Sequence, residues 1–250
     1  MVAGAGPGIG GACAVALGRA GADVVIAARD GERLAGLAAE VATQTGGSVT
    51  PVVADLARLE SCKFLVEQAV KRHGRIDVLV NVATAGGGWQ PLDQADWDSW
   101  RHAFEVNVIG TLELTRLAAR CMREVGGGSI IQIGTFGTHS LPPGQARYTA
   151  TKQAMVSASL SLAREVGKWN VRVNIVTPGY TTGPPLDTMV AGVAARTGED
   201  VGEVSQRLAG TAALRRHIDP DDIAAAVLFL ASPGARSITG VEVPVTAGQR

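Results

Sequence analysis

Short runs of apolar, often β-branched residues alternate along the chain with longer stretches in which apolar residues recur every three to four positions. The short runs predict strands, and the longer stretches predict helices. Strands are expected over residues 1–3, 23–28, 48–54, 76–82, 129–134, 171–177 and 240–245. Helices are expected over residues 9–20, 31–43, 59–73, 96–125, 146–167 and 220–231. This alternation is typical of βαβ units, whose crossover helices force the strands to be parallel.

Several of the expected strands are apolar at every position, as in Val24-Val25-Ile26 and Val78-Leu79-Val80. Strands of this kind are covered on both faces, which predicts an α/β fold with a doubly wound, Rossmann-type parallel sheet. Pro51 lies within the third expected strand and cannot donate to a neighbouring strand, so that strand is expected at an edge. The predicted strand order is therefore 3-2-1-4-5-6-7.

The regular alternation extends from one end of the sequence to the other, with one interruption. We therefore expect a single domain over residues 1–250. The interruption covers residues 180–214, where Gly183-Pro184-Pro185 precedes two short amphipathic stretches. We interpret it as an insertion over the carboxyl ends of the strands, where ligands bind in open α/β sheets.

Composition narrows the class of protein. The chain is 46% hydrophobic, and its 23 basic residues equal its 23 acidic residues, so nucleic acid is not an expected partner. No apolar run approaches the ~20 residues that span a bilayer, and glycines interrupt the uncharged first segment, which argues against a signal peptide. No membrane association is expected.

Cysteine and histidine are few and scattered. The three cysteines, which form no Cys-x-x-Cys pair, are Cys13, Cys62 and Cys121. The four histidines, which show no ligand spacing, are His73, His102, His139 and His217. These patterns predict a reduced, cytoplasmic protein without a metal site.

Two motifs carry the candidate chemistry. The glycine-rich segment Gly4-Ala5-Gly6-Pro7-Gly8-Ile9-Gly10 lies between a predicted strand and a predicted helix, where backbone amides and the helix N-terminus can bind a pyrophosphate. Tyr148 and Lys152 are four residues apart on a predicted helix, so their side chains share one face. A nearby cation favours the phenolate and brings tyrosine toward acid/base chemistry. Either motif alone also occurs for purely structural reasons.

In this order and spacing, the motifs resemble the short-chain dehydrogenase/reductase family over essentially the whole chain. The resemblance implies an oxidoreductase in which Tyr148 is the acid/base, Lys152 lowers its pKa, Asn107 supports a water and Thr135 orients the substrate oxygen. It also implies a homo-oligomer, a tetramer or a dimer. The cofactor-binding residues expected on this basis are Gly4, Pro7, Gly8, Ile9, Gly10, Arg29, Asp55, Leu56, Asn81, Ala83, Tyr148, Lys152, Pro178, Gly179, Thr181 and Thr182.

Three departures from the family pattern affect the site. Thr135 stands thirteen residues before Tyr148, where the family has serine; Thr138 and Ser140 are the alternatives if the loop is shifted. The family's Asn-Asn-Ala-Gly turn reads Asn81-Val82-Ala83-Thr84. Only three residues precede Gly4, so either the first strand is a stub or the start lies upstream.

The end of the second strand bears on the choice of cofactor. Ala28 occupies the position at which NAD enzymes carry an acidic residue, and Arg29 follows it. Because an arginine accommodates the 2′-phosphate of NADP, NADP(H) is favoured over NAD(H). Asp30 is interpreted as a helix cap, with inward rotation toward a ribose as the alternative.

The substrate is expected to be a small alcohol or ketone, bound by Phe136, His139, Tyr180 and Met189. The leading hypothesis is an NADP(H)-dependent enzyme that interconverts a secondary alcohol and a ketone. The alternatives are a catalytically retired nucleotide-binding scaffold or sensor, and a 3-ketoacyl-thioester reductase. A basic patch for an acidic carrier would favour the last, but only Arg215-Arg216 and Lys71-Arg72 form short basic pairs.

Overall fold

The computed structural model describes residues 1–86 and 88–249. Within this part of the chain, seven strands form one sheet in the order β3-β2-β1-β4-β5-β6-β7, and every neighbouring pair is parallel. The strands are β1 Val2–Ala3, β2 Val24–Ala28, β3 Val49–Val53, β4 Val78–Asn81, β5 Gly128–Ile133, β6 Val171–Pro178 and β7 Glu242–Val245. This is the predicted Rossmann-type order, and Pro51 lies in the edge strand as expected.

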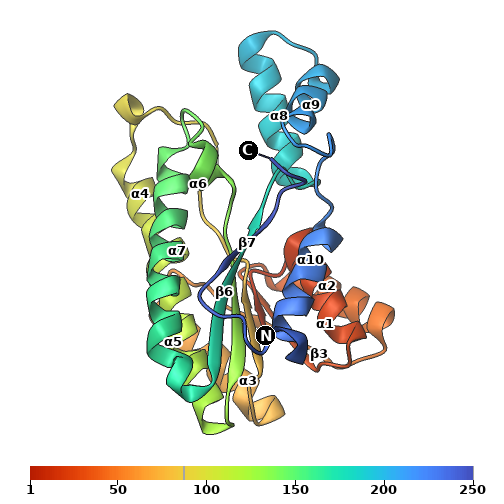
Figure 1. Cartoon of the computed structure of the whole chain (residues 1–250), viewed down its shortest axis with the longest axis vertical. Helices are drawn as coiled ribbons and strands as arrows, with labels where there is room; N and C mark the ends of the chain where they lie inside the picture. The colour runs from red at the N-terminus through yellow and green to blue at the C-terminus, as the bar shows by residue number, and fades with distance from the viewer. Residues whose placement is uncertain (87, 250) are drawn as a thin grey trace.

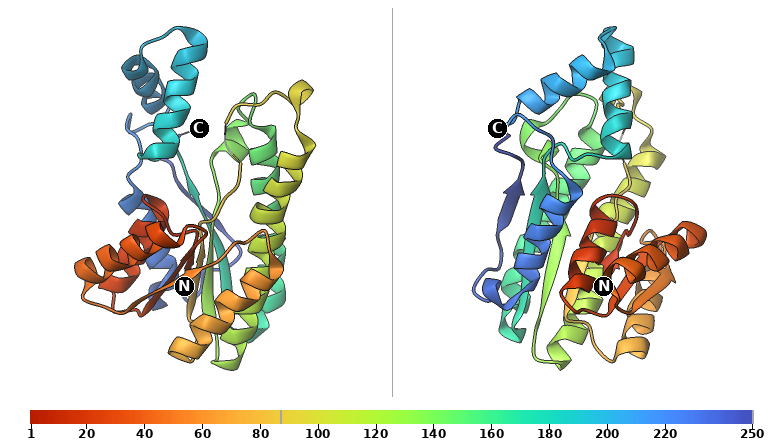
Figure 2. Two further views of the ribbon diagram at one scale, coloured as in Figure 1. Left: turned by 180° about the vertical axis from the view of Figure 1, so that it is seen from behind. Right: turned by 90° about the vertical axis from the view of Figure 1, so that its right-hand side faces the viewer.

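Helices cover both faces of the sheet (Figures 1 and 2). The α-helices are α1 Ile9–Arg19, α2 Gly31–Thr45, α3 Leu59–His73, α4 Trp97–Phe104, α5 Thr111–Glu124, α6 Gly137–Ser140, α7 Ala146–Val166, α8 Pro184–Thr197, α9 Val201–Gly210 and α10 Pro220–Ala231. Short helical turns are η1 Leu92–Gln94, η2 Glu105–Gly110, η3 Gly167–Trp169 and η4 Pro233–Ala235.

Successive strand residues point to opposite faces, so each strand contributes to two cores. Ala27, Leu79 and Ile130 pack with α3, α5 and α7, whereas Ile26 and Val80 pack with α1, α2 and α10. This burial on both faces explains why the strands are continuously apolar in sequence.

The first strand is two residues long, yet it joins the two halves of the sheet. Val2 and Ala3 are fully buried and pair with β2 on one side and β4 on the other. The amide nitrogens of Gly4 and Ala5 donate to the Ala27 oxygen at 2.8 and 2.9 Å. The terminal amine donates to the Val78 oxygen at 2.8 Å, which extends the pairing beyond the strand itself.

The helix expected over residues 96–125 is continuous in space but not regular. Its middle, η2, is a π-helical stretch that contains Asn107, between α4 and α5. Gly110 ends this stretch against the loop after β3, and a Cβ at this position would overlap the Leu56 carbonyl oxygen. A π-turn inserts an extra residue into the helical repeat, which changes the direction in which its side chains point.

Helices α8 and α9 form a hairpin above the carboxyl ends of the strands, where the insertion was expected (Figure 1). The hairpin has its own apolar cluster, whose buried members are Leu186, Val190, Ala194, Val204 and Leu208. This cluster is separate from the two cores that flank the sheet.

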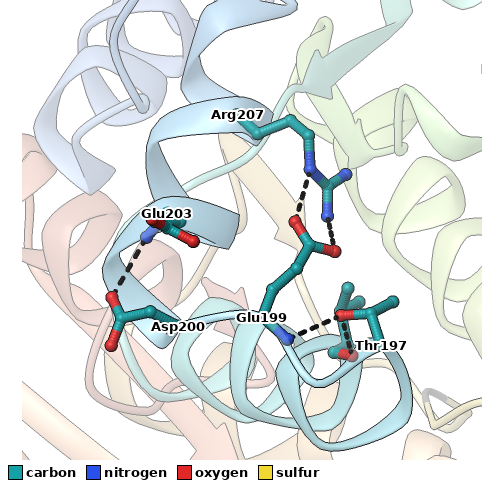
Figure 3. Close-up of polar contacts among 6 residues, drawn as sticks. Thr197, Glu199, Asp200, Glu203 and Arg207 are labelled. Atoms are coloured by element: carbon teal, nitrogen blue, oxygen red, sulfur yellow. Dashed lines mark hydrogen bonds and ion pairs between the residues drawn. The ribbon is translucent and has the colours of Figure 1, made fainter.

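Polar contacts order the turn between α8 and α9 (Figure 3). The Glu199 carboxylate accepts two hydrogen bonds from the Arg207 guanidinium, at 3.0 and 3.2 Å. The Glu199 amide donates to the Thr197 hydroxyl at 3.4 Å, and Asp200 caps α9 by accepting from the Glu203 amide at 3.3 Å. These contacts all lie within residues 197–207, so the hairpin's own residues order its tip.

Candidate active site

A cavity of about 950 Å³ runs along the carboxyl ends of the strands, beneath the α8–α9 hairpin. Its wall includes residues that follow all seven strands of the sheet, such as Gly8 after β1, Asp55 after β3 and Gly179 after β6. The expected cofactor-binding residues on this wall are Gly4, Pro7, Gly8, Ile9, Gly10, Arg29, Asp55, Leu56, Ala83, Tyr148, Lys152, Pro178, Gly179, Thr181 and Thr182.

The glycine-rich turn approaches the sheet closely and leaves a helix N-terminus open to the cavity. Gly4 has a φ of 89°, and a Cβ there would overlap the Ala83 backbone. Gly8, with a φ of 110°, precedes α1 and supplies no side-chain cap to the helix. Ile9 and Gly10, in the first turn of α1, line the cavity. Uncapped amides at a helix N-terminus fit the pyrophosphate of a dinucleotide.

Tyr148 and Thr135 meet on the cavity wall, from α7 and from the loop after β5. Burial raises the pKa of Tyr148 above its ordinary value of 10, and a hydrogen bond with the Thr135 side chain opposes that rise. Of the alternative hydroxyls, Ser140 also lines the cavity, whereas Thr138 donates to the Thr135 carbonyl oxygen at 2.7 Å. Thr135 is thus the hydroxyl placed beside the phenol.

Lys152 is buried one helical turn after Tyr148, with 4% of its surface exposed. Its ammonium donates to the Ile133 carbonyl oxygen at 2.9 Å, and burial lowers its pKa from 10.5 to about 8. The resemblance implied that Lys152 lowers the pKa of Tyr148. In this structure the net direction for Tyr148 is the opposite, because the effect of burial exceeds that of its polar contacts.

Asn107 lies behind the cavity wall and connects two of its segments. Its amide oxygen accepts from the Ala85 nitrogen at 2.7 Å, and its amide nitrogen donates to the Ala85 oxygen at 2.5 Å. The same nitrogen donates to the Thr151 hydroxyl of α7 at 2.9 Å. Asn107 therefore ties the loop after β4 to the helix that carries Tyr148 and Lys152.

Asn81 faces away from the cavity, unlike the other expected cofactor contacts. Its side-chain nitrogen donates to the Thr115 hydroxyl at 3.0 Å, and the Gln132 side chain donates to the same oxygen at 2.9 Å. Thr115 in turn donates to the Thr111 carbonyl oxygen at 2.7 Å. These contacts make Asn81 part of a buried polar cluster between the sheet and α5.

Basic side chains gather at the end of β2. Arg29 and Arg33 both line the cavity, next to Ala28. The Asp30 carboxylate accepts from the Arg33 amide at 3.1 Å and caps α2, in agreement with its interpretation as a cap. The Arg33 guanidinium also lies 3.3 Å from the Asp30 carboxylate.

The outer part of the cavity is mostly apolar. Phe136, Tyr180 and Met189 lie on its wall, together with Leu186. His139 does not: its ring stacks on Phe136, with centroids 5.5 Å apart. Tyr180 packs edge-on against the ring of His217, which shares a 2.9 Å hydrogen bond with Ser205 of α9.

Sequence reasoning missed several wall residues. Arg33, Gln145 and Gln249 line the cavity, but none belongs to the motifs that the sequence analysis used. Arg33 lies one helical turn after Asp30. The interpretation of Asp30 as a helix cap therefore places Arg33 in the first turn of α2, near the end of β2. No pattern in the sequence indicates that Gln249 returns to the site.

The open helix N-terminus, the glycine-rich turn and the Tyr148–Lys152 pair line one cavity, and such a helix N-terminus suits the phosphates of a nucleotide. Over residues 4–250, the chain matches the family model described as Enoyl-(Acyl carrier protein) reductase. The chain belongs to the short-chain dehydrogenase/reductase family and is an oxidoreductase of that family that uses a nicotinamide cofactor.

Relatives and solved structures of similar sequence cover nearly the whole chain. An uncharacterized oxidoreductase of Methylorubrum extorquens is 37% identical over 250 residues, which are 100% of this chain and 96% of the relative. L-sorbose reductase from Gluconobacter frateurii, complexed with NADPH and L-sorbose, is 30% identical with a TM-score of 0.93, over 99% of this chain and 94% of that one. An NAD⁺-bound xylitol dehydrogenase is 27% identical with a TM-score of 0.93, over 98% and 96% respectively.

Two absences among the described residues bear on other kinds of site. No group of three or more His, Cys, Asp or Glu side chains is arranged to hold a metal ion in residues 1–86 and 88–249. In the same part of the chain, no helix is both long and apolar enough to cross a membrane.

Proposed function

We propose that the protein is an NADP(H)-dependent oxidoreductase that interconverts a secondary alcohol and a ketone, with Tyr148 as the acid/base. The observation that carries the proposal is the meeting of the Tyr148 and Thr135 hydroxyls on the wall of one cavity, with Lys152 beside them and the open N-terminus of α1 on the same wall. The bound nicotinamide supplies the hydride acceptor or donor for the substrate carbon.

Each side chain has a distinct task in this proposal. Tyr148 exchanges a proton with the substrate oxygen, and the Thr135 hydroxyl holds that oxygen in place. Lys152 contributes positive charge next to the cofactor ribose, and a bound cofactor offers it hydroxyl partners in addition to the Ile133 oxygen. Asn107 keeps α7 in register with the loop after β4.

Replacing Tyr148 by Phe tests the acid/base assignment. Because the phenol hydroxyl is the proposed proton donor, kcat is expected to fall by about 10²–10⁴-fold. The affinity for NADPH, measured by fluorescence titration, is expected to change little. Full turnover by Tyr148→Phe would contradict the assignment. A scaffold or sensor, in contrast, would bind NADPH in both forms and turn over no ketone in either.

The preference for NADP(H) rests on charge at the end of β2. Arg29 and Arg33 line the cavity beside Ala28, and Asp30, which lines it too, uses its carboxylate to cap α2 and lies 3.3 Å from the Arg33 guanidinium. Two guanidinium groups favour a 2′-phosphate. The solved relatives include one bound to NADPH and one bound to NAD⁺, so cofactor choice differs among similar structures.

Substitution of Arg29 tests this preference. Since a hydrogen bond to a charged group contributes roughly 1.5–3 kcal/mol, Arg29→Ala is expected to weaken NADPH binding by about 10–100-fold and NADH binding far less. Arg72→Ala on α3, outside the cavity, is the matched control. Equal losses for NADPH and NADH would show that Arg29 does not contact the 2′-phosphate.

We also propose that the protein self-associates through α4 and η2. Trp97, Phe104 and Ile109 on these elements are large apolar side chains with exposed fractions of 57%, 36% and 51%. Exposed apolar side chains gathered on adjacent elements are typical of interaction surfaces. Size-exclusion chromatography with light scattering is expected to give a dimer or tetramer, and a monomer at micromolar concentration would contradict the proposal.

A further inference from the structure

Three neighbouring strands send residues to the same end of the cavity. Thr135 follows β5, Gly179 follows β6, and Gln249 follows β7 after a short turn. Thr135 and Gln249 thus line one cavity from segments that follow the strands on either side of β6.

The turn after β7 is fixed by backbone contacts. Ala247 and Gly248 have φ values of 52° and 76°, and the Gln249 amide donates to the Thr246 oxygen at 3.0 Å. The Leu214 amide donates to the Ala247 oxygen at 3.0 Å, and the Ala213 amide donates to the Gly248 oxygen at 3.3 Å. The segment that connects α9 to α10 thus holds this turn in place.

The Gln249 side chain lies directly against the backbone that follows β6. Its Oε1 atom is 2.9 Å from the point where a Cβ on Gly179 would stand, so the absence of a side chain at Gly179 makes the room. Gln249 also lines the cavity. In Figure 1, the segment after β7 runs toward the space between α6 and α8.

The cavity that Gln249 lines is mostly apolar. Its wall includes Leu186 and Met189 from α8, Pro142 and Phe136. A glutamine side-chain amide offers one acceptor and two donors. Among the described residues, no hydrogen bond involves the side-chain amide of Gln249. A polar group in a largely apolar wall costs free energy unless a ligand completes its hydrogen bonds.

We propose that Gln249 determines substrate specificity by binding a second oxygen atom of the substrate. This inference deepens the proposed function, because it places the reacting oxygen at Thr135 and Tyr148. A substrate whose carbonyl lies at Thr135 and Tyr148 needs a further oxygen atom to pair with Gln249, so the substrate class is a hydroxyketone or diketone rather than a simple ketone.

A site that is built to hydrogen-bond a substrate oxygen rejects the analogue that lacks it, since its own polar group is then left unpaired. The test uses matched pairs such as 4-hydroxy-4-methyl-2-pentanone with 4,4-dimethyl-2-pentanone, and 3-hydroxy-3-methylcyclohexanone with 3,3-dimethylcyclohexanone, in which a methyl group replaces a tertiary hydroxyl. Each compound is titrated into the protein saturated with NADP⁺, and dissociation constants are obtained by NMR. No reaction takes place, because the oxidised cofactor can neither reduce a ketone nor oxidise a tertiary alcohol.

The variant Gln249→Met keeps the length of the side chain and removes the amide. Gln206→Met, at an exposed position of α9 outside the cavity, is the matched control. Wild-type protein and the control are expected to bind the hydroxylated member of a pair about tenfold more tightly, and Gln249→Met is expected to bind both members alike. Circular dichroism and NADP⁺ affinity show whether the variant keeps its fold.

Two outcomes would overturn the inference: no preference for the hydroxylated member in any pair, including the case in which no compound binds, or an undiminished preference in Gln249→Met. Turnover of the same ketones with NADPH is measured separately. Selectivity that depends on Gln249 without any turnover would contradict the proposed function and support the role of Gln249. Turnover of the ketones without this selectivity would support the proposed function and contradict the role of Gln249.

Discussion

Lys152 is the buried charge whose replacement gives the most informative test of the site. Its ammonium lies in the interior with 4% of its surface exposed, and its hydrogen-bond acceptor is the neutral carbonyl oxygen of Ile133 at 2.9 Å. Burying a charge without an opposite charge destabilises the folded state. Lys152→Met removes the charge and retains most of the apolar stem.

The magnitude follows from the change in pKa. Burial lowers the pKa of Lys152 from 10.5 to about 8, and each pKa unit corresponds to about 1.4 kcal/mol. The charged lysine therefore lowers the free energy of unfolding by about 3 kcal/mol. Because the pKa is lower in the folded state, this penalty is fully present below pH 8 and disappears as the pH rises toward 10.5.

The assay is urea denaturation without cofactor, at intervals from pH 7 to pH 10. Relative to Lys152→Met, the wild-type protein is expected to gain stability as the pH rises, by about 2–3 kcal/mol over this interval. The difference between the two proteins isolates Lys152, because the other titrating groups are common to both. Parallel stability curves over this pH range would refute the conclusion that Lys152 is buried as an uncompensated charge.

Two further predictions concern the support of the site. Gly110→Ala is expected to lower stability by about 1–3 kcal/mol, because the new Cβ overlaps the Leu56 carbonyl oxygen, whereas Gly36→Ala, in open space on α2, is expected to raise it by about 0.5–1 kcal/mol. Differential scanning calorimetry compares the two, and equal effects would contradict the reasoning. Thr115→Val is expected to cost about 2–4 kcal/mol by denaturant titration, since two buried amides lose their acceptor. Thr43→Val, at an exposed position of α2, is the control and is expected to change stability by less than about 0.5 kcal/mol; a similar loss there would contradict the prediction.

The strands could be predicted because burial on both faces leaves a direct trace in the sequence. Continuous apolar runs such as Val24-Val25-Ile26 occur where helices cover the sheet on each side, and the edge position of β3 follows from the missing amide hydrogen of Pro51. Asp30 was recognisable as a cap because capping is a local interaction within one helical turn.

The features that escaped prediction depend on contacts between distant segments. The π-helical turn around Asn107 adapts the helix to the loops after β3 and β4, and no periodicity in its own sequence indicates it. The turning of Asn81 toward Thr115 depends on α5, and the arrival of Gln249 at the cavity depends on the turn after β7. The raised pKa of Tyr148 is likewise a consequence of packing rather than of spacing.

The α8–α9 hairpin encloses its own apolar cluster, and the ion pair between Glu199 and Arg207 lies within the hairpin (Figure 3). A substitution in that cluster is expected to destabilise the hairpin more than the sheet, because the sheet packs against different residues. The part of the molecule that covers the cavity can therefore diverge in evolution, or be exchanged by an engineer, while the foldability of the sheet and its flanking helices is preserved.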